Sequence, residues 1–160
     1  MAWDPAQYLK FSNHRLRPAL DLRAQIPLAA PERIVDLGCG AGNVTRFLAE
    51  RWPQAQISGV DNSAEMLAKA RSSMPQAEWV ESSIASWEPK APVDLIYSNA
   101  ALHWLPDHPA LFARLLGFLK PGGRLAVQMP RNLAARSQTS SDAALDALGL
   151  PADLRTSDEA

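Results

Sequence analysis

Short apolar runs alternate along this chain with segments whose apolar residues recur at helical spacing. The runs at 33–37, 56–61, 77–81, 93–98 and 124–129 are the length of buried strands. Between them, residues 43–52, 64–73 and 109–119 carry apolar side chains three or four positions apart, which is typical of amphipathic helices. Strict alternation of this kind favours an α/β fold, a doubly wound and mostly parallel sheet with helices on both faces.

Capping and turn residues predict where these elements begin and end. Asn62 and Ser63 are expected to cap the helix at 64–73, with Glu65 reaching back to Asn62 as in a capping box. The run 120–123 (Lys-Pro-Gly-Gly) is expected to turn the chain before the last strand. The helix at 109–119 is predicted to turn its apolar side chains inward: Leu111, Phe112, Leu115, Leu116 and Leu119.

The composition narrows the class of protein. The 160 residues carry a net charge of −1, which offers no basic surface for nucleic acid or an anionic membrane. A single cysteine permits no internal disulfide, and no apolar run approaches the ~18 residues that span a bilayer. The first residues lack the pattern of a signal peptide, and the three histidines have no metal-ligand spacing. We therefore expect a cytoplasmic single domain without a metal.

The clearest indication of a ligand-binding site is a glycine-rich turn between a predicted strand and a predicted helix. Gly38, Gly40 and Gly42 follow the strand directly, and Asp61 ends the next strand, where an acid can accept hydrogen bonds from ribose hydroxyls. The Gly-x-Gly-x-Gly spacing differs from the Gly-x-Gly-x-x-Gly of dinucleotide-binding proteins. Asp36 lies within the otherwise apolar strand, where a buried carboxylate needs either a cationic ligand or backbone donors of the turn.

These residues resemble the first motif of the class I S-adenosylmethionine-dependent methyltransferases. Residues 94–99 and 119–123 resemble that family's fourth strand and the turn before its fifth, so the resemblance covers 33–130. It implies a Rossmann-like sheet and S-adenosyl-L-methionine as cofactor. The implied cofactor-binding residues are Asp36, Gly38, Cys39, Gly40, Gly42, Asp61, Asn62, Met66, Ser83, Ile84 and Asn99. Cys39 itself is interpreted as a small buried residue and not a nucleophile.

A narrower resemblance links the chain to the members of this family that esterify a carboxylate of trans-aconitate. It rests on residues 3–18, 99–108 and 125–132. A small carboxylic acid is then the expected substrate, and its carboxylate is already ionised at pH 7, so no general base is required. Arg17, His103 and Trp104 are the candidates for positioning it, with Arg131 weaker. Arg17 could instead be a solvated helix charge, and His103 could only pack its loop.

The chain departs from the family pattern at two places. Ser83 stands where the family usually has an aspartate that binds the adenine amino group. The family also continues well beyond the fifth strand, so we expect a sheet that is incomplete at its C-terminal edge. The expected regions are a helical segment over the site (1–30, helical from about residue 8), a methyltransferase domain (31–132) and a poorly ordered or truncated tail (133–160).

Three other functions remain open at this point. The chain could methylate a different small acid, or bind the cofactor without catalysis because the substrate-covering half is missing. A nicotinamide-dependent oxidoreductase is the weakest alternative, since the glycine spacing and Asp36 both argue against it. The sequence does not predict an oligomeric state.

Overall fold

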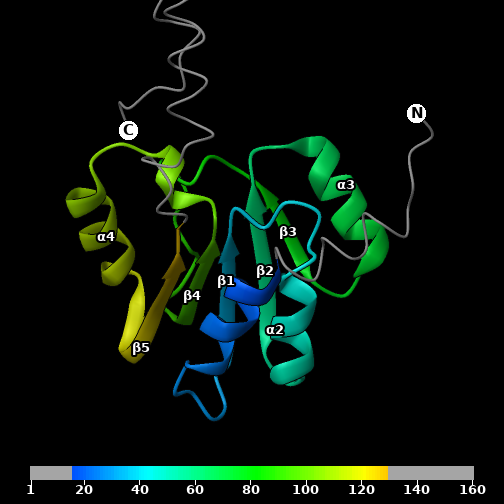
Figure 1. Cartoon of the computed structure of the whole chain (residues 1–160), viewed down its shortest axis with the longest axis horizontal. Helices are drawn as coiled ribbons and strands as arrows, with labels where there is room; N and C mark the ends of the chain where they lie inside the picture. Colours follow the sequence, from blue (N-terminus) through cyan, green and yellow to red (C-terminus); the bar gives the residue numbers. More distant parts are fainter. Residues whose placement is uncertain (1–15, 130–160) are drawn as a thin grey trace, which may run out of the picture.

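The computed structural model describes residues 16–129, and these form one layered α/β unit (Figure 1). Residues 16–24 are helical and lead into the sheet. In chain order the further elements are β1 (Arg33–Leu37), α2 (Thr45–Arg51), β2 (Gln56–Asp61), α3 (Ala64–Ser73), β3 (Glu78–Glu81), β4 (Val93–Asn99), the short 3₁₀ helix η1 (Leu102–Trp104), α4 (His108–Gly117) and β5 (Leu119–Gln128). Each predicted strand is present, with the bounds of β1 and β2 as expected.

The five strands form one sheet in the order β3-β2-β1-β4-β5, and every neighbouring pair is parallel. The order reverses direction at β1, because β2 and β3 extend to one side of it and β4 and β5 to the other. This confirms the doubly wound α/β fold. Ligands of such sheets bind beyond the carboxyl ends of the strands, at the point where the order reverses.

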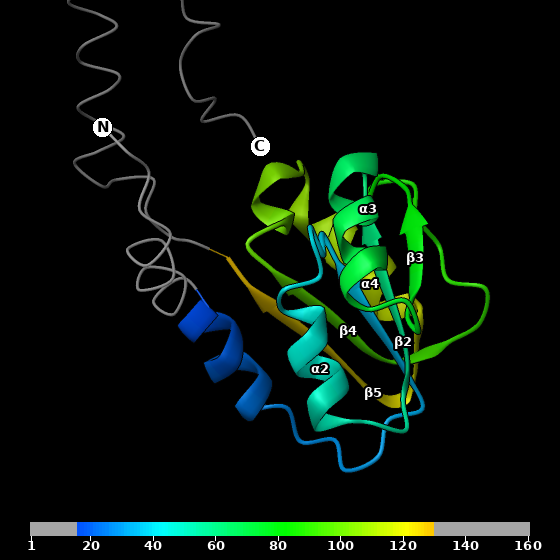
Figure 2. The ribbon, with the colours of Figure 1, turned by 90° about the vertical axis from the view of Figure 1, so that its right-hand side faces the viewer.

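Apolar side chains cover both faces of the sheet, as expected for strands buried on two sides. On one face Ile34, Leu95 and Tyr97 pack with Leu48 and Trp52 of α2, beside the helical residues 16–24 (Figure 2). On the other face Val35 and the strands beside it pack against α4 and Trp87. Cys39 packs with Trp79 and the buried side of α3. Three tryptophans are buried in the core: Trp52, Trp79 and Trp87.

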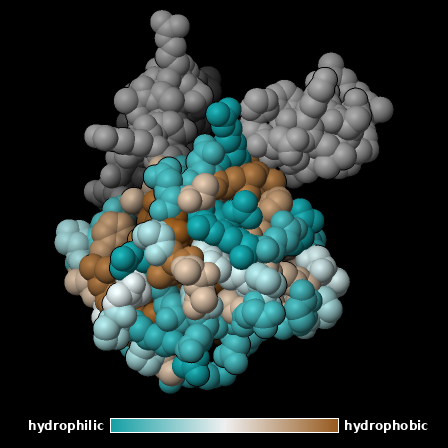
Figure 3. Space-filling model, turned by 90° about the horizontal axis from the view of Figure 1, so that it is seen from below, coloured by the Kyte–Doolittle hydropathy of each residue, from teal (hydrophilic) through white to brown (hydrophobic). Residues whose placement is uncertain are grey.

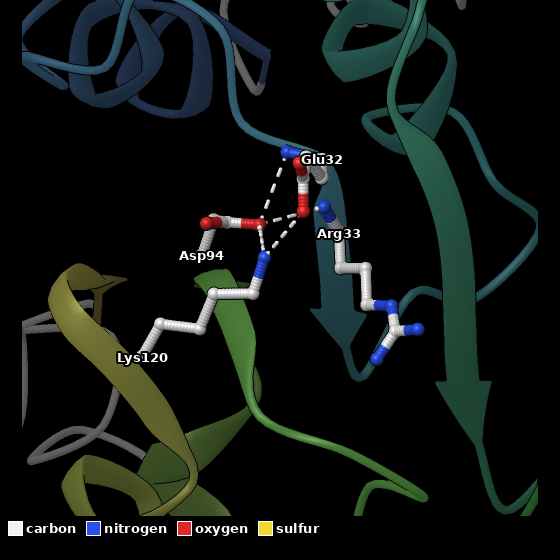
Figure 4. Close-up of polar contacts among 4 residues, drawn as sticks. All are labelled: Glu32, Arg33, Asp94 and Lys120. Carbon is white, nitrogen blue, oxygen red and sulfur yellow. Dashed lines mark hydrogen bonds and ion pairs between the residues drawn. The ribbon is translucent and has the colours of Figure 1, made fainter.

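Polar contacts join three strands at the opposite, amino-terminal edge of the sheet (Figure 4). Asp94 Oδ2 accepts hydrogen bonds from the backbone N–H groups of Glu32 and Arg33, at 3.0 and 2.9 Å. Lys120 Nζ donates to the same oxygen at 3.0 Å and to Glu32 Oε2 at 2.7 Å. We call these four residues the amino-edge clamp. Seen from this side, hydrophilic residues cover much of the surface, with smaller apolar areas among them (Figure 3).

The structure corrects three local predictions. The cap of α3 is Ser63, whose Oγ accepts from the Met66 N–H, whereas Glu65 pairs with Lys69 and does not reach back to Asn62. β5 begins at Leu119, before the predicted turn, but residues 120–123 have no partner in the register with β4, which pairs Leu119 with Val93 and then Arg124 with Leu95. Leu116 is 55% exposed, because α4 turns only Leu111 and Leu115 fully inward.

Parts of several expectations fall outside the described residues. The helix expected from about residue 8 is seen only over 16–24, and the tail expected at 133–160 and Arg131 lie outside them altogether. The three expected regions therefore stay predictions. Among residues 16–129 no helix is long and apolar enough to cross a membrane.

Candidate active site

The candidate site lies at the carboxyl ends of β1, β2 and β4, where the glycine turn, the start of α3 and η1 meet at one edge of the sheet (Figure 1). All three glycines of the turn adopt positive φ, +73° for Gly38, +53° for Gly40 and +78° for Gly42. A side chain would strain the backbone at each of them. Their surroundings, however, differ.

Gly40 is the glycine that leaves space for a ligand. A Cβ built on Gly40 would meet no atom within 4 Å, whereas one on Gly42 would lie 2.8 Å from the ring of Trp79. A Cβ on Gly38 would overlap the methyl group of Ala101, which follows β4. Gly38 and Gly42 are therefore needed for packing within the protein, and Gly40 is the point where backbone faces open space.

Asp36 lies beneath this turn, 2% exposed, near the end of β1. Its Oδ2 accepts a hydrogen bond from the hydroxyl of Thr45, at 2.6 Å. Burial raises the pKa of Asp36 from 3.8 to about 7; the Thr45 hydrogen bond opposes that rise and the charge of Asp61 adds to it. Among residues 16–129, the backbone of the turn does not donate to Asp36; the hydroxyl of Thr45 does. This contact of Thr45 was not predicted. The sequence does indicate it, because a hydroxyl residue at the start of the helix that follows a buried acid can donate to that acid.

Asp61, at the end of β2, joins two loops. Its Oδ2 accepts from the Gly40 N–H at 2.8 Å, and its Oδ1 accepts from the Ser63 N–H at 2.9 Å. The carboxylate thus holds the glycine turn against the start of α3. Each oxygen of a carboxylate can accept further hydrogen bonds, so these contacts leave capacity for ribose hydroxyls.

The remaining candidates near these loops differ in exposure. Asn62 and Met66 are exposed at the start of α3, with Met66 at 39%. Cys39 is buried, as interpreted from the sequence, and burial raises the pKa of its thiol, with the charges of Asp36 and Asp61 adding to the rise. A thiol held protonated in this way is a packing group and not a nucleophile.

Ser83 and Ile84 follow β3 in a tight turn. Ser83 is exposed, and its Oγ accepts from the Ala85 N–H at 3.2 Å. The Ile84 side chain lies against the glycine turn, since its Cδ1 is 3.6 Å from the position of a Cβ on Gly38. The structure therefore brings Ile84 next to the glycine turn, and Ser83 precedes it in the same turn.

Asn99 and His103 approach the same edge from the end of β4 and from η1. Asn99 Oδ1 and His103 Nδ1 are buried and have no hydrogen-bond partner in the part of the chain that is described. Ala100 between them has φ of +53°, a left-handed conformation that costs a non-glycine residue about 1 kcal/mol. Buried polar atoms without partners, next to a strained residue, are typical of a ligand site.

The two other positioning candidates are exposed. Trp104 is 75% exposed, with its ring 4.6 Å from that of His103. Arg17 is also exposed and pairs at 3.7 Å with Asp21, one helical turn away. The part of Arg17 in positioning the acid stays a prediction, beside the alternative of a solvated helix charge.

Comparison with known proteins yields one family. A family model described as a methyltransferase domain matches residues 34–123. Two curated relatives, both named trans-aconitate 2-methyltransferase, come from Azoarcus sp. (strain BH72) and Rhodopseudomonas palustris (strain BisB18). The first is 57% identical over 130 residues, covering 81% of this chain and 51% of its own; the second is 53% identical over 131 residues, covering 82% and 51%.

A solved structure with similar architecture is an S-adenosylmethionine dependent methyltransferase from Mesorhizobium loti. Its TM-score is 0.62 at 35% identity, and the match covers 72% of this chain and 53% of that one. The chain thus spans about half the length of the curated relatives it matches.

Proposed function

This chain belongs to the methyltransferase domain family, and from that membership we propose that it is the cofactor-binding part of an enzyme that methylates a carboxylate of trans-aconitate or of a similar small acid. S-Adenosyl-L-methionine is the cofactor. The proposal concerns the whole enzyme, because the relatives named for this reaction are about twice as long as the matched segment.

The observation that carries the proposal is the open space at Gly40, whose backbone N–H is bound by the carboxylate of Asp61. A second carboxylate, that of Asp36, is buried at the end of β1, just before the glycine turn. S-Adenosylmethionine carries an ammonium group and a ribose diol, which a carboxylate can bind by charge and by hydrogen bonds respectively. A cation beside Asp36 would also favour the ionised carboxylate that burial disfavours.

The chemistry asks little of the side chains beyond positioning. When bound, the cofactor supplies a methyl group on a positively charged sulfur. The acceptor carboxylate is ionised at neutral pH, so the protein has to align it and exclude water. Buried groups with free hydrogen-bonding capacity at the end of β4 suit this task.

Asn99 and His103 are the residues with that capacity. Burial lowers the pKa of His103, with the charge of His108 adding to the effect, so the imidazole is neutral at physiological pH. A neutral imidazole with an unpaired Nδ1 can donate a hydrogen bond to a carboxylate oxygen without placing a full charge beside the nucleophile. Trp104 would then form an exposed wall beside it.

The test is product analysis with the purified chain. Binding of S-adenosylhomocysteine is measured first by calorimetry, and the chain is then incubated with methyl-labelled S-adenosylmethionine and trans-aconitate. Labelled methyl ester of trans-aconitate supports the proposal in full. Ester formed only from another small acid would mean that this acid, and not trans-aconitate, is the substrate. Because the proposal concerns the whole enzyme, cofactor binding without turnover of any acid would support only the cofactor-binding role of this chain. Absence of cofactor binding would contradict the proposal.

A further inference from the structure

The turn over residues 83–87 carries Ser83 and Ile84, two of the predicted cofactor-binding residues, and belongs to no strand or helix. Its internal hydrogen bonds are short-range, from the Ser86 and Trp87 N–H groups to the Ser83 carbonyl at 3.2 and 2.9 Å. Within residues 16–129, every hydrogen bond that links this turn to a distant part of the chain comes from one side chain, that of Arg114.

Arg114 donates two hydrogen bonds to the turn. Its Nη2 donates to the Ile84 carbonyl at 2.6 Å, and its Nη1 donates to the Trp87 carbonyl at 2.7 Å. A planar guanidinium that spans two carbonyls fixes both distance and orientation, which a lysine could not do. The contact is also packed, because Trp87 meets Phe118 edge to face at 5.9 Å between ring centroids and the Arg114 guanidinium lies 5.6 Å from the Phe118 ring.

The other end of α4 contacts the acceptor side of the site. His108 Nε2 lies 3.0 Å from the carbonyl oxygen of Leu102 in η1, the element that carries His103. The helix between them is 10 residues long, or about 15 Å. One helix therefore contacts the loop that would hold the acceptor acid at its first turn and the 83–87 turn at its last.

From these contacts we infer that Arg114 is a positioning residue for cofactor binding, which sets the place of the 83–87 turn against the glycine turn. The inference rests on the proposed function, since it assigns the 83–87 turn to the adenine end of S-adenosylmethionine. Arg114 does not touch the glycine turn in these contacts; Ile84, whose carbonyl it binds, does. Its effect on the ligand is therefore indirect.

The first experiment needs no ligand. Arg114→Met keeps the aliphatic part of the side chain and removes both donors, and Arg46→Met is the matched control, because Arg46 is an exposed arginine paired with Glu50 on α2. Amide hydrogen exchange at Ser86 and Trp87 is expected to rise at least about tenfold in Arg114→Met, as expected when a charged donor is lost. Exchange that rises equally across the whole protein, or stays unchanged at these amides, would overturn the inference.

The second experiment asks whether the effect reaches the ligand. Calorimetry with S-adenosylhomocysteine should show affinity about tenfold weaker in Arg114→Met, partly restored in Arg114→Lys, and unchanged in Arg46→Met. In S-inosylhomocysteine an oxygen replaces the adenine amino group. For this ligand, the fold-loss of affinity caused by Arg114→Met should be at least threefold smaller than for S-adenosylhomocysteine. Equal losses for the two ligands would mean that Arg114 supports the fold in general, which contradicts the inference.

The two experiments separate this inference from the function it rests on. If the unsubstituted chain does not bind S-adenosylhomocysteine, the proposed function fails, while hydrogen exchange still decides whether Arg114 holds the turn. If the chain binds and Arg114→Met binds equally well, the function stands and the positioning role is wrong.

Discussion

Asp36 and Asp94 lie on the adjacent strands β1 and β4, and their surroundings shift the pKa of the two carboxyls in opposite directions. Burial dominates at Asp36 and raises its pKa to about 7. At Asp94 burial also raises the pKa, but hydrogen bonds from the backbone N–H of Arg33, from Lys120 and from the backbone N–H of Glu32 outweigh it and leave the pKa below its usual value. The folded chain thus supplies the hydrogen-bond donors that stabilise the ionised form of Asp94. The ionised form of Asp36 is unfavourable in the folded chain, and a cationic ligand would stabilise it.

Asp36→Asn should stabilise the free protein above neutral pH while weakening cofactor binding. In the unfolded chain this carboxyl ionises near pH 3.8 and in the folded chain near 7, so between these values unfolding releases a proton and rising pH favours the unfolded state. Its stabilising contribution is therefore complete below pH 3.8 and lost by about pH 7. The amide keeps an acceptor for Thr45 and removes this loss, so the gain should grow from pH 4 to pH 7 and reach up to about 4 kcal/mol.

Urea unfolding of both forms across this pH range measures the effect, and calorimetry with S-adenosylhomocysteine measures the binding. Asp94→Asn is the matched control and should lose stability at pH 8, since its carboxylate is well partnered. A stability difference for Asp36→Asn that does not change with pH would contradict the account of Asp36.

Ser83→Asp should tighten cofactor binding. The residue is exposed and at the start of a turn, so an aspartate fits there and can still accept from the Ala85 N–H. A charged acceptor for the adenine amino group should gain about 1–2 kcal/mol over a hydroxyl, or roughly tenfold in affinity. Calorimetric titration with S-adenosylhomocysteine checks this, with Ser86→Asp as a control in the same turn. Unchanged or weaker binding in Ser83→Asp would show that residue 83 does not face the adenine.

Among the elements, the central strands were predictable because both of their faces are buried. β1 carries Ile34, Val35 and Leu37, and residues 57–60 of β2 are apolar or small, as is typical of strands buried on both faces. A turn was predicted at Lys120–Gly123 because Pro and Gly usually mark turns, and these residues interrupt β5 instead of preceding it: Leu119 and Arg124 pair with β4, and the four residues between them have no partner in that register. The start of β5 at Leu119 depends on its pairing with Val93, which no local pattern indicates.

The candidate site was predictable where a single motif forms it and not where separate elements meet. The glycine turn and Asp61 follow from spacing along the chain. The hydrogen bonds from Arg114 to the 83–87 turn depend on how α4 packs on the sheet. The partners of Arg114 are 27 and 30 residues away in sequence, so no local pattern announces them.

The amino-edge clamp should contribute to stability without contributing to ligand binding. Asp94→Ala leaves the N–H groups of Glu32 and Arg33 and the ammonium of Lys120 without their shared acceptor. We expect a loss of about 1–3 kcal/mol in the free energy of unfolding, measured by urea denaturation. The affinity for S-adenosylhomocysteine should not change, because the clamp lies at the opposite edge of the sheet (Figure 4).

Glu78→Ala is the control for a surface ion pair, since Glu78 and its partner Lys90 are 58% and 90% exposed at their side chains. Its effect should be close to zero. A clamp substitution that is as mild as Glu78→Ala would mean that the contacts seen at Asp94 do not hold the three strands together.

At the scale of the whole molecule, the amino-terminal and carboxyl ends of the parallel strands differ in how their polar groups are paired. At the amino-terminal ends, backbone and side-chain groups satisfy one another in the clamp. At the carboxyl ends, Asn99 Oδ1 and His103 Nδ1 are left without partners among residues 16–129, and Asp36 carries a raised pKa. A ligand that binds these groups in the folded protein adds its binding free energy to the stability of the folded state.

A ligand that fills this edge should therefore raise the unfolding temperature. Binding to the folded state alone stabilises by about 2.7 kcal/mol at a ligand concentration of 100 times Kd, which for a chain of this size corresponds to roughly 5–10 °C. S-Adenosylhomocysteine should produce this shift in thermal unfolding, and NAD should not, because the three glycines do not have the dinucleotide spacing. Gly40→Val is the matched variant: its side chain would enter the open space, so the shift should disappear. A shift with NAD equal to that with S-adenosylhomocysteine would restore the oxidoreductase alternative.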